Sequence, residues 1–135
     1  MKIKKNIIFG ICLIMIINRK AFIVGVKSTR LSNKEKKFLK KYKPWGVILF
    51  SRNIKKFDQV KNLISDIKLI FKDKKYPILI DQEGGRINRL KNLIESETFT
   101  SKFFGNLYRK NKNKFSIYYK IYINQISYLL NELGI

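Results

Sequence analysis

Residues 77–86 read Pro-Ile-Leu-Ile-Asp-Gln-Glu-Gly-Gly-Arg, and this stretch decides the fold. Its first four residues have the length and composition of a buried β-strand, at whose first position proline is tolerated. Asp81 ends the strand, and the Gly84-Gly85 pair permits a tight turn. A buried strand followed by a polar, glycine-containing loop is typical of the carboxyl edge of a parallel sheet, where α/β proteins bind ligands.

Upstream of this stretch, two strand patterns alternate with two helix patterns. Residues 21–26 and 46–50 are short apolar runs rich in β-formers. Between them, Ser32 and Glu35 have the spacing of a capping box that begins a helix, and Pro44 ends it. Residues 55–72 carry apolar side chains at helical spacing. This order predicts right-handed βαβ crossovers and a parallel sheet.

Downstream, the alternation of strand and helix patterns stops, and we expect a long loop over residues 86–113. A final helix follows, with apolar residues on one side and Gly134 just past its end. Val47, Leu49, Ile78 and Ile80 share one face of the predicted sheet, and we expect this face to lack partners. A chain that ends on a helix after three strands looks truncated.

The first 20 residues form a separate segment. Lysines precede an uncharged apolar run from Ile7 to Ile17, which is shorter than the roughly 20 residues of a membrane-spanning helix. Basic residues follow the run, and there is no small-residue cleavage site of a signal peptide. We interpret residues 1–20 as an extension of unclear role. The alternative is weak membrane association through this segment.

Length and composition limit the possible functions. The 135 residues suffice for one domain, but a complete (β/α)8 barrel needs about 250. Histidine is absent, which removes the usual general base at neutral pH. The single cysteine, Cys12, excludes an internal disulfide and a cysteine-based zinc site. The net charge of +21 comes mainly from lysine in a chain rich in Lys, Ile and Asn, whose codons are A/T-rich. We therefore expect a solvated basic surface with no specific nucleic-acid partner.

Two motifs carry a resemblance to a known family. Residues 81–89, Asp-Gln-Glu-Gly-Gly-Arg-Ile-Asn-Arg, resemble the D-x-E-G-G-R-V-x-R signature of glycoside hydrolase family 3, in the form found in bacterial β-N-acetylhexosaminidases. Residues 44–53 resemble the segment that lies one βα unit earlier in these enzymes, and Gln59 and residues 103–105 also fit. The resemblance covers residues 21–135. It implies an α/β fold that is the amino-terminal part of a TIM barrel, with the first three βα units of the parallel barrel.

The resemblance also implies roles for individual residues. Asp81 would accept hydrogen bonds from hydroxyls of the N-acetylglucosamine in the −1 subsite, and Arg89 would also bind substrate. Four residues between them would shape the loop: Glu83, Gly84, Gly85 and Arg86. Residue chemistry alone leaves an alternative open, in which Asp81 caps the next turn and pairs with an arginine.

The catalytic residues of the family have no counterpart in this sequence. Its aspartate nucleophile and histidine acid/base lie beyond the position that matches Ile135, and retaining hydrolysis needs both groups. The resemblance implies a cytoplasmic enzyme that releases terminal β-N-acetylglucosamine from peptidoglycan-derived muropeptides without a metal or organic cofactor. We expect this chain to be inactive alone, and a complementing carboxy-terminal barrel fragment is a further candidate partner.

Two other functions remain open. The chain could be a basic, non-catalytic module that binds nucleic acid or an anionic surface, because its charge is strongly positive. Alternatively, it could be a partial domain that residues 2–20 tether to a membrane.

Overall fold

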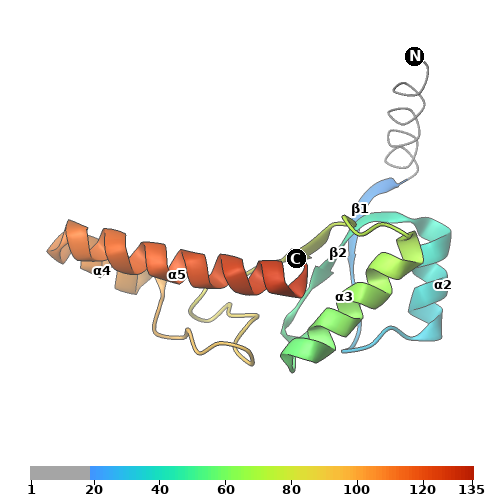
Figure 1. The fold of residues 1–135 in the computed structure, drawn as a ribbon, viewed down its shortest axis with the longest axis horizontal. Helices are drawn as coiled ribbons and strands as arrows, with labels where there is room; N and C mark the ends of the chain where they lie inside the picture. The colour runs from blue at the N-terminus through green and yellow to red at the C-terminus, as the bar shows by residue number, and fades with distance from the viewer. Residues whose placement is uncertain (1–18) are drawn as a thin grey trace, which may run out of the picture.

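The computed structural model describes residues 19–135, which form a three-stranded sheet and four α-helices (Figure 1). The predictions for the amino-terminal extension and its membrane association fall almost entirely on residues 1–18 and lie outside the described residues. The elements in chain order are β1 (Lys20–Gly25), α2 (Asn33–Tyr42), β2 (Pro44–Leu49), the 3-10 helix η1 (Ser51–Asn53), α3 (Phe57–Phe71), β3 (Ile78–Ile80), α4 (Ser101–Lys110) and α5 (Lys112–Leu133).

The sheet is parallel and has the order β1-β2-β3, which confirms the predicted α/β class and the strand–helix alternation. Val24, Val47 and Ile78 lie side by side across the three strands. Since α2 and α3 are the two crossovers, all three strands end at the same edge of the sheet. Strand β1 and strand β3 form its two outer edges within the described residues.

The core lies between the sheet and the helices, and here one expectation is wrong. Val47 and Leu49 are completely buried, and Ile78 is 7% exposed. Together with Ile80, they pack in the core formed with the apolar residues of α2 and α3, instead of lacking partners. Side chains alternate along a strand, so the opposite face carries the neighbouring residues Ile23, Ile48 and Leu79, of which Ile23 is 46% exposed.

The segment predicted to be a loop over residues 86–113 contains α4, so that expectation is also wrong. The Thr100 side chain accepts a hydrogen bond from the Phe103 backbone N–H and begins the helix. Phe104 is 5% exposed, because it packs among aromatic residues of α5. Residues 81–100 are irregular, as predicted for the first part of that segment.

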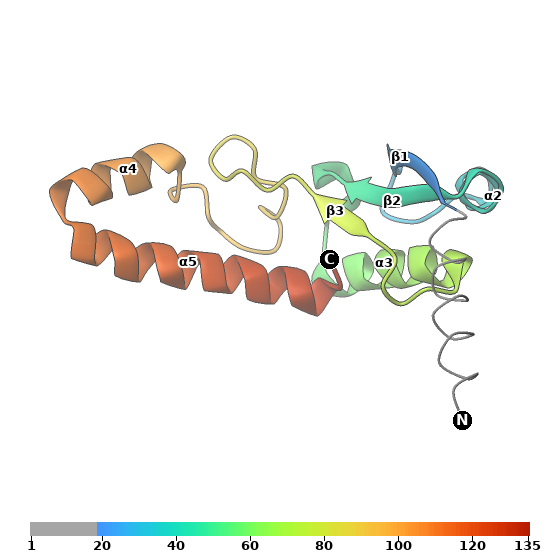
Figure 2. The same cartoon turned by 90° about the horizontal axis from the view of Figure 1, so that it is seen from above.

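Helix α5 is confirmed, and it ends at Gly134, whose φ of 86° is left-handed. Figures 1 and 2 show that α4 and α5 form an antiparallel hairpin extending beyond the sheet, with the carboxyl end of α5 returning to α3. There the Lys68 ammonium donates a hydrogen bond of 2.7 Å to the Gly134 carbonyl. None of the helices within residues 19–135 combines the length and the apolar composition that crossing a membrane requires.

Candidate functional site

The two residues predicted to bind substrate lie together at the carboxyl end of β3. Asp81 follows the strand directly, and its Oδ2 atom is 3.5 Å from Nη2 of Arg89. The Asp81 side chain is 45% exposed and that of Arg89 is 23% exposed. This geometry gives an ion pair with a weak contact, so both groups keep capacity for further hydrogen bonds. The alternative from residue chemistry alone was that Asp81 pairs with an arginine, and this pairing is present in the structure.

A tight glycine turn brings Arg89 back to Asp81. Gly84 and Gly85 have φ values of 82° and 58°, a conformation that favours glycine. The turn is closed by reciprocal backbone bonds between Gly84 and Ile87, at 3.1 and 3.2 Å. A Cβ atom on Gly84 would also lie 3.2 Å from the Phe99 carbonyl oxygen. The path of the loop therefore favours glycine at both positions, and most strongly at Gly84.

Gln82 fixes the backbone on the far side of this turn, a role that the sequence analysis missed. Its Oε1 atom accepts hydrogen bonds from the backbone N–H groups of Arg89 at 2.8 Å and Leu90 at 3.2 Å. Its Nε2 donates to Asn88 Oδ1, and Asn88 in turn donates to the Ser96 hydroxyl, each at 3.0 Å. Asn88 and Ser96 are buried. The network therefore fixes the position of the Arg89 backbone, from which the side chain extends.

The Arg89 guanidinium also meets an aromatic ring from the neighbouring strand. Its Cζ atom is 5.5 Å from the centroid of Phe50, directly after β2, and Arg52 Cζ lies 4.6 Å from the same centroid. Arg89 Nε is buried and has no hydrogen-bond partner within residues 19–135. An unsatisfied buried donor costs roughly 1–3 kcal/mol, and such groups are often found at functional sites.

Asn53 and Gln59 join the loops that follow β1 and β2. Asn53 is completely buried; its Nδ2 donates to the carbonyls of Val26 and Ser28, and its Oδ1 accepts from the Phe50 N–H. Gln59 Nε2 donates to the carbonyls of Thr29 and Asn53. These bonds, between 2.8 and 3.0 Å long, form a clamp that holds Phe50 beside the Asp81–Arg89 pair.

The remaining loop residues lie on two sides of the turn. Arg86 is exposed, forms no ion pair with the described residues, and lines a pocket of about 390 Å³ with Ser51 and Asn88. Glu83 is also exposed and lines another pocket, next to the α4–α5 hairpin. The Glu83 N–H donates to the Ile87 carbonyl, so its backbone takes part in the turn.

The fold and the site together are typical of parallel α/β enzymes that bind a ligand at the carboxyl edge of the sheet. The chain is an α/β protein with parallel strands joined by helices, and a carboxylate–guanidinium pair lies where β3 ends. Polar groups at this edge are where enzymes with parallel α/β folds bind their ligands.

Comparison with known proteins finds β-hexosaminidases that are similar to this chain in sequence. The chain is 39% identical over 71 residues to a β-hexosaminidase of Alkalilimnicola ehrlichii, which is 51% of this chain and 20% of that protein. It is 34% identical over 73 residues to the β-hexosaminidase of Neisseria meningitidis serogroup B, covering 54% and 20% of the two chains. No family model matches the sequence.

A solved crystal structure is also similar to this chain. The crystal structure of NagZ from Neisseria gonorrhoeae in complex with zinc ion matches with a TM-score of 0.57 and 30% identity, over 69% of this chain and 27% of that chain. The similarity to β-hexosaminidases that the motifs predicted is thus confirmed, and these relatives are glycoside hydrolases. The chain spans about a fifth of the length of the curated relatives it matches.

Proposed function

We propose that residues 21–135 are the substrate-binding part of a retaining β-N-acetylhexosaminidase domain, formed by the first three βα units of a TIM barrel. The observation that carries this proposal is the Asp81–Arg89 pair at the carboxyl end of β3, inside the motif that resembles glycoside hydrolase family 3. The relatives named β-hexosaminidase support the same chemistry.

In this proposal the pair recognises one sugar ring. The half-exposed Asp81 carboxylate accepts hydrogen bonds from sugar hydroxyls, and charge-assisted bonds of this kind are stronger than neutral ones. Arg89 lies against Phe50 and donates from a fixed position. Glu83, Gly84, Gly85 and Arg86 shape the loop that presents both side chains.

Hydrolysis itself needs a nucleophile and an acid/base on opposite sides of the glycosidic bond. The family resemblance gives the acid/base role to a histidine, and this sequence has none. We therefore propose that the catalytic groups come from residues outside this sequence. The partly open sheet face with Ile23, Ile48 and Leu79, next to the outer edge of β3, is a suitable place for further barrel units to pack.

The substrate that we propose is terminal β-linked N-acetylglucosamine on muropeptides derived from peptidoglycan, and the compartment is the cytoplasm. Both follow from the family resemblance of the motifs around Asp81 and Arg89.

A chimeric enzyme tests the proposal. Residues 19–135 would replace the matched part of Neisseria gonorrhoeae NagZ, and hydrolysis of 4-nitrophenyl N-acetyl-β-glucosaminide would be measured. We expect turnover by the chimera and none by the isolated 135-residue chain. Asp81→Asn and Arg89→Ala should each lower kcat/KM about 10- to 100-fold, the effect of losing a hydrogen bond to a charged group.

Glu95→Gln is the matched control, because Glu95 is exposed and forms no ion pair with the described residues. It should leave kcat/KM unchanged. A folded chimera without activity, or an active one that tolerates both Asp81→Asn and Arg89→Ala, would contradict the proposal.

A further inference from the structure

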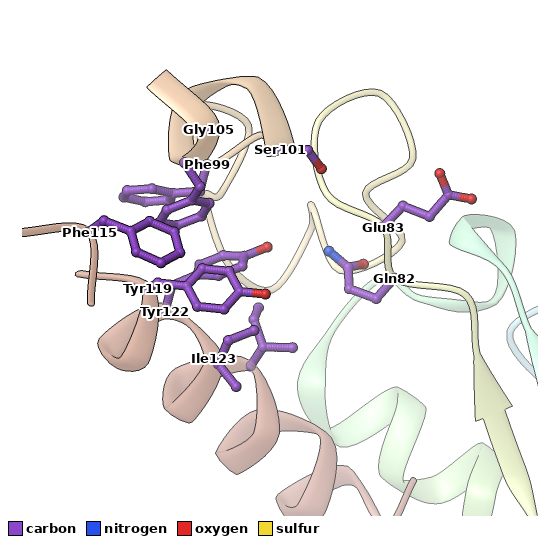
Figure 3. Close-up of a pocket in the computed structure, with 11 residues that line it drawn as sticks. Gln82, Glu83, Phe99, Ser101, Gly105, Phe115, Tyr119, Tyr122 and Ile123 are labelled. Carbon is purple, nitrogen blue, oxygen red and sulfur yellow. The ribbon is translucent and has the colours of Figure 1, made fainter. Parts of the chain in front are cut away.

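A second concave site lies between the irregular segment 81–100 and the α4–α5 hairpin. It has a volume of about 460 Å³, within the usual range of ligand pockets. Figure 3 shows that its walls are mainly aromatic, with side chains from both sides of the hairpin. The aromatic residues that line it are Phe99, Phe104, Phe115, Tyr119 and Tyr122. The mechanism proposed for Asp81 and Arg89 uses none of them.

The aromatic rings are held in place by one another. The centroid of Phe104 lies 5.0 Å from that of Tyr119 and 5.3 Å from that of Tyr122, and Phe99 is 5.6 Å from Tyr122. These separations are those of favourable edge and offset contacts. Phe104 is 5% exposed at the base, whereas Phe99 and Tyr119 are 37% and 41% exposed. The pocket therefore presents aromatic surface that is already ordered.

Two hydroxyl groups point into this space without a partner in the part of the chain that the structure describes. Figure 3 shows the hydroxyls of Tyr119 and Tyr122 directed toward the Gln82 side chain. Within residues 19–135 neither hydroxyl forms a hydrogen bond, whereas the Tyr76 hydroxyl donates to the Pro44 carbonyl. The Gln82 amide is already bonded to Asn88, Arg89 and Leu90. The two phenols are therefore free to bond a ligand at the mouth of the pocket.

Charge limits which ligand fits. Among residues 19–135, no Lys or Arg lines this pocket, and Glu83 is the single charged residue that does. An anionic ligand would meet the Glu83 carboxylate with no cation among the described lining residues to balance it. A neutral ring with an apolar face and hydroxyls at its rim matches both the aromatic walls and the free phenols. A pyranose has this form, because its axial C–H groups meet the negative face of an aromatic ring.

We infer that this pocket is a second carbohydrate site, which binds one neutral sugar ring of a glycan by stacking it on Phe99 and Tyr119 while Tyr122 bonds its hydroxyls. The site is distinct from the Asp81–Arg89 pair, and the inference stands even if the chain has no part in hydrolysis.

Ligand-observed saturation-transfer NMR on the full chain, with triacetylchitotriose as the probe, tests this inference. We expect transfer to the sugar C–H protons, a tenfold or greater weakening of Kd in Tyr119→Ala and Phe99→Ala, and a smaller loss in Tyr122→Phe, which keeps the ring. Tyr128→Ala is the matched control: it lies on the same helix, is 69% exposed and does not line the pocket. Circular dichroism of each variant checks its helix content.

The Asp81→Asn variant separates this inference from the proposed function. In that variant, transfer to the glycan should persist and should still disappear with Tyr119→Ala. If Asp81→Asn abolishes binding and the aromatic variants do not, the glycan binds at the first site alone and the inference is wrong. Displacement of the sugar by tetramethylammonium, with dependence on Glu83, would make the pocket a cation site and also overturn it.

Discussion

Asn53 illustrates how one side chain organises the carboxyl edge of the sheet. Its amide makes three hydrogen bonds to backbone groups from two loops, and the residue has no exposed surface. Arg52 and Gln59 also link the two loops, but the Phe50 N–H itself donates to Asn53 Oδ1, so the position of Phe50 depends on this amide.

Replacing Asn53 by Ala should be strongly destabilising. The change leaves the Phe50 N–H and the Ser28 carbonyl without their partner, while the Val26 carbonyl keeps its bond from Arg52 Nε. Each unsatisfied buried group costs about 1–3 kcal/mol. We expect the free energy of unfolding to fall by about 2–4 kcal/mol in urea denaturation. Asn62→Ala, at an exposed position of α3, is the control and should change it by less than about 0.5 kcal/mol. Equal effects of the two substitutions would disprove the clamp.

At the scale of elements, helix α2 is tied to the loop after β1 through Glu35. Its carboxylate accepts 2.8 Å hydrogen bonds from the backbone N–H groups of Ser32 and Lys27, and Ser32 Oγ accepts from the Glu35 N–H. Burial raises the pKa of Glu35, but the hydrogen bonds from Ser32 and Lys27 outweigh it and hold the pKa below its usual value of 4.5.

This lowered pKa predicts a loss of stability in acid. A carboxyl group with a depressed pKa in the folded state contributes stability above its unfolded pKa, and that contribution disappears as the pH falls through the folded pKa. Glu35→Gln should therefore be less stable than the natural chain at pH 7, by at most about 1 kcal/mol because solvent screens this partly exposed charge, and the difference should shrink below pH 4. Urea denaturation across this pH range measures it. A difference that is the same at pH 7 and pH 3 would contradict the assignment.

The elements show why part of the fold could be predicted. Strands β1 to β3 are short apolar runs rich in β-formers, helices α2, α3 and α5 have apolar residues at helical spacing, and Ser32 with Glu35 marks a helix start. Helix α4 was missed because Phe103, and not Glu or Gln, stands three residues after its cap Thr100, so no capping box is visible. The helix-covered face of the sheet was also misassigned, because a period of two says which residues share a face but not which face the helices cover.

The candidate site, like the fold, was predictable from the sequence only in part. The meeting of Asp81 and Arg89 follows from a strand end and a glycine turn, both visible in the sequence. The role of Gln82 was not predictable, because its bonds reach backbone groups up to eight residues away and depend on the path of the turn. The aromatic pocket depends on α4, so missing that helix concealed it.

At the scale of the whole molecule, positive charge dominates the surface. Residues 101–131 contain six Lys and Arg residues and no acidic residue. The described residues form three ion pairs in all: Arg19–Asp73, Lys61–Glu132 and Arg89–Asp81. Most of the basic residues within 19–135 are therefore without an acidic partner.

If this charge reflects composition, RNA binding should be weak and insensitive to sequence. Fluorescence anisotropy with two unrelated single-stranded RNAs should give the same Kd, and the affinity should fall at least tenfold between 50 and 200 mM salt because counterions are released on binding. Tight binding of one of the two RNAs at physiological salt would instead favour the basic nucleic-acid module.

The clamp formed by Asn53 and Gln59 has a consequence for how this edge can evolve. Asn53 donates to the carbonyl oxygens of Val26 and Ser28, and Gln59 donates to that of Thr29. These backbone acceptors are present whatever side chain the three positions carry. Mutations at Ser28 or Thr29 therefore leave the acceptors in place. The loop after β1 is free to accumulate new side chains over generations, while the scaffold that positions Phe50 stays constant, and new ligand preferences can arise there without loss of the fold.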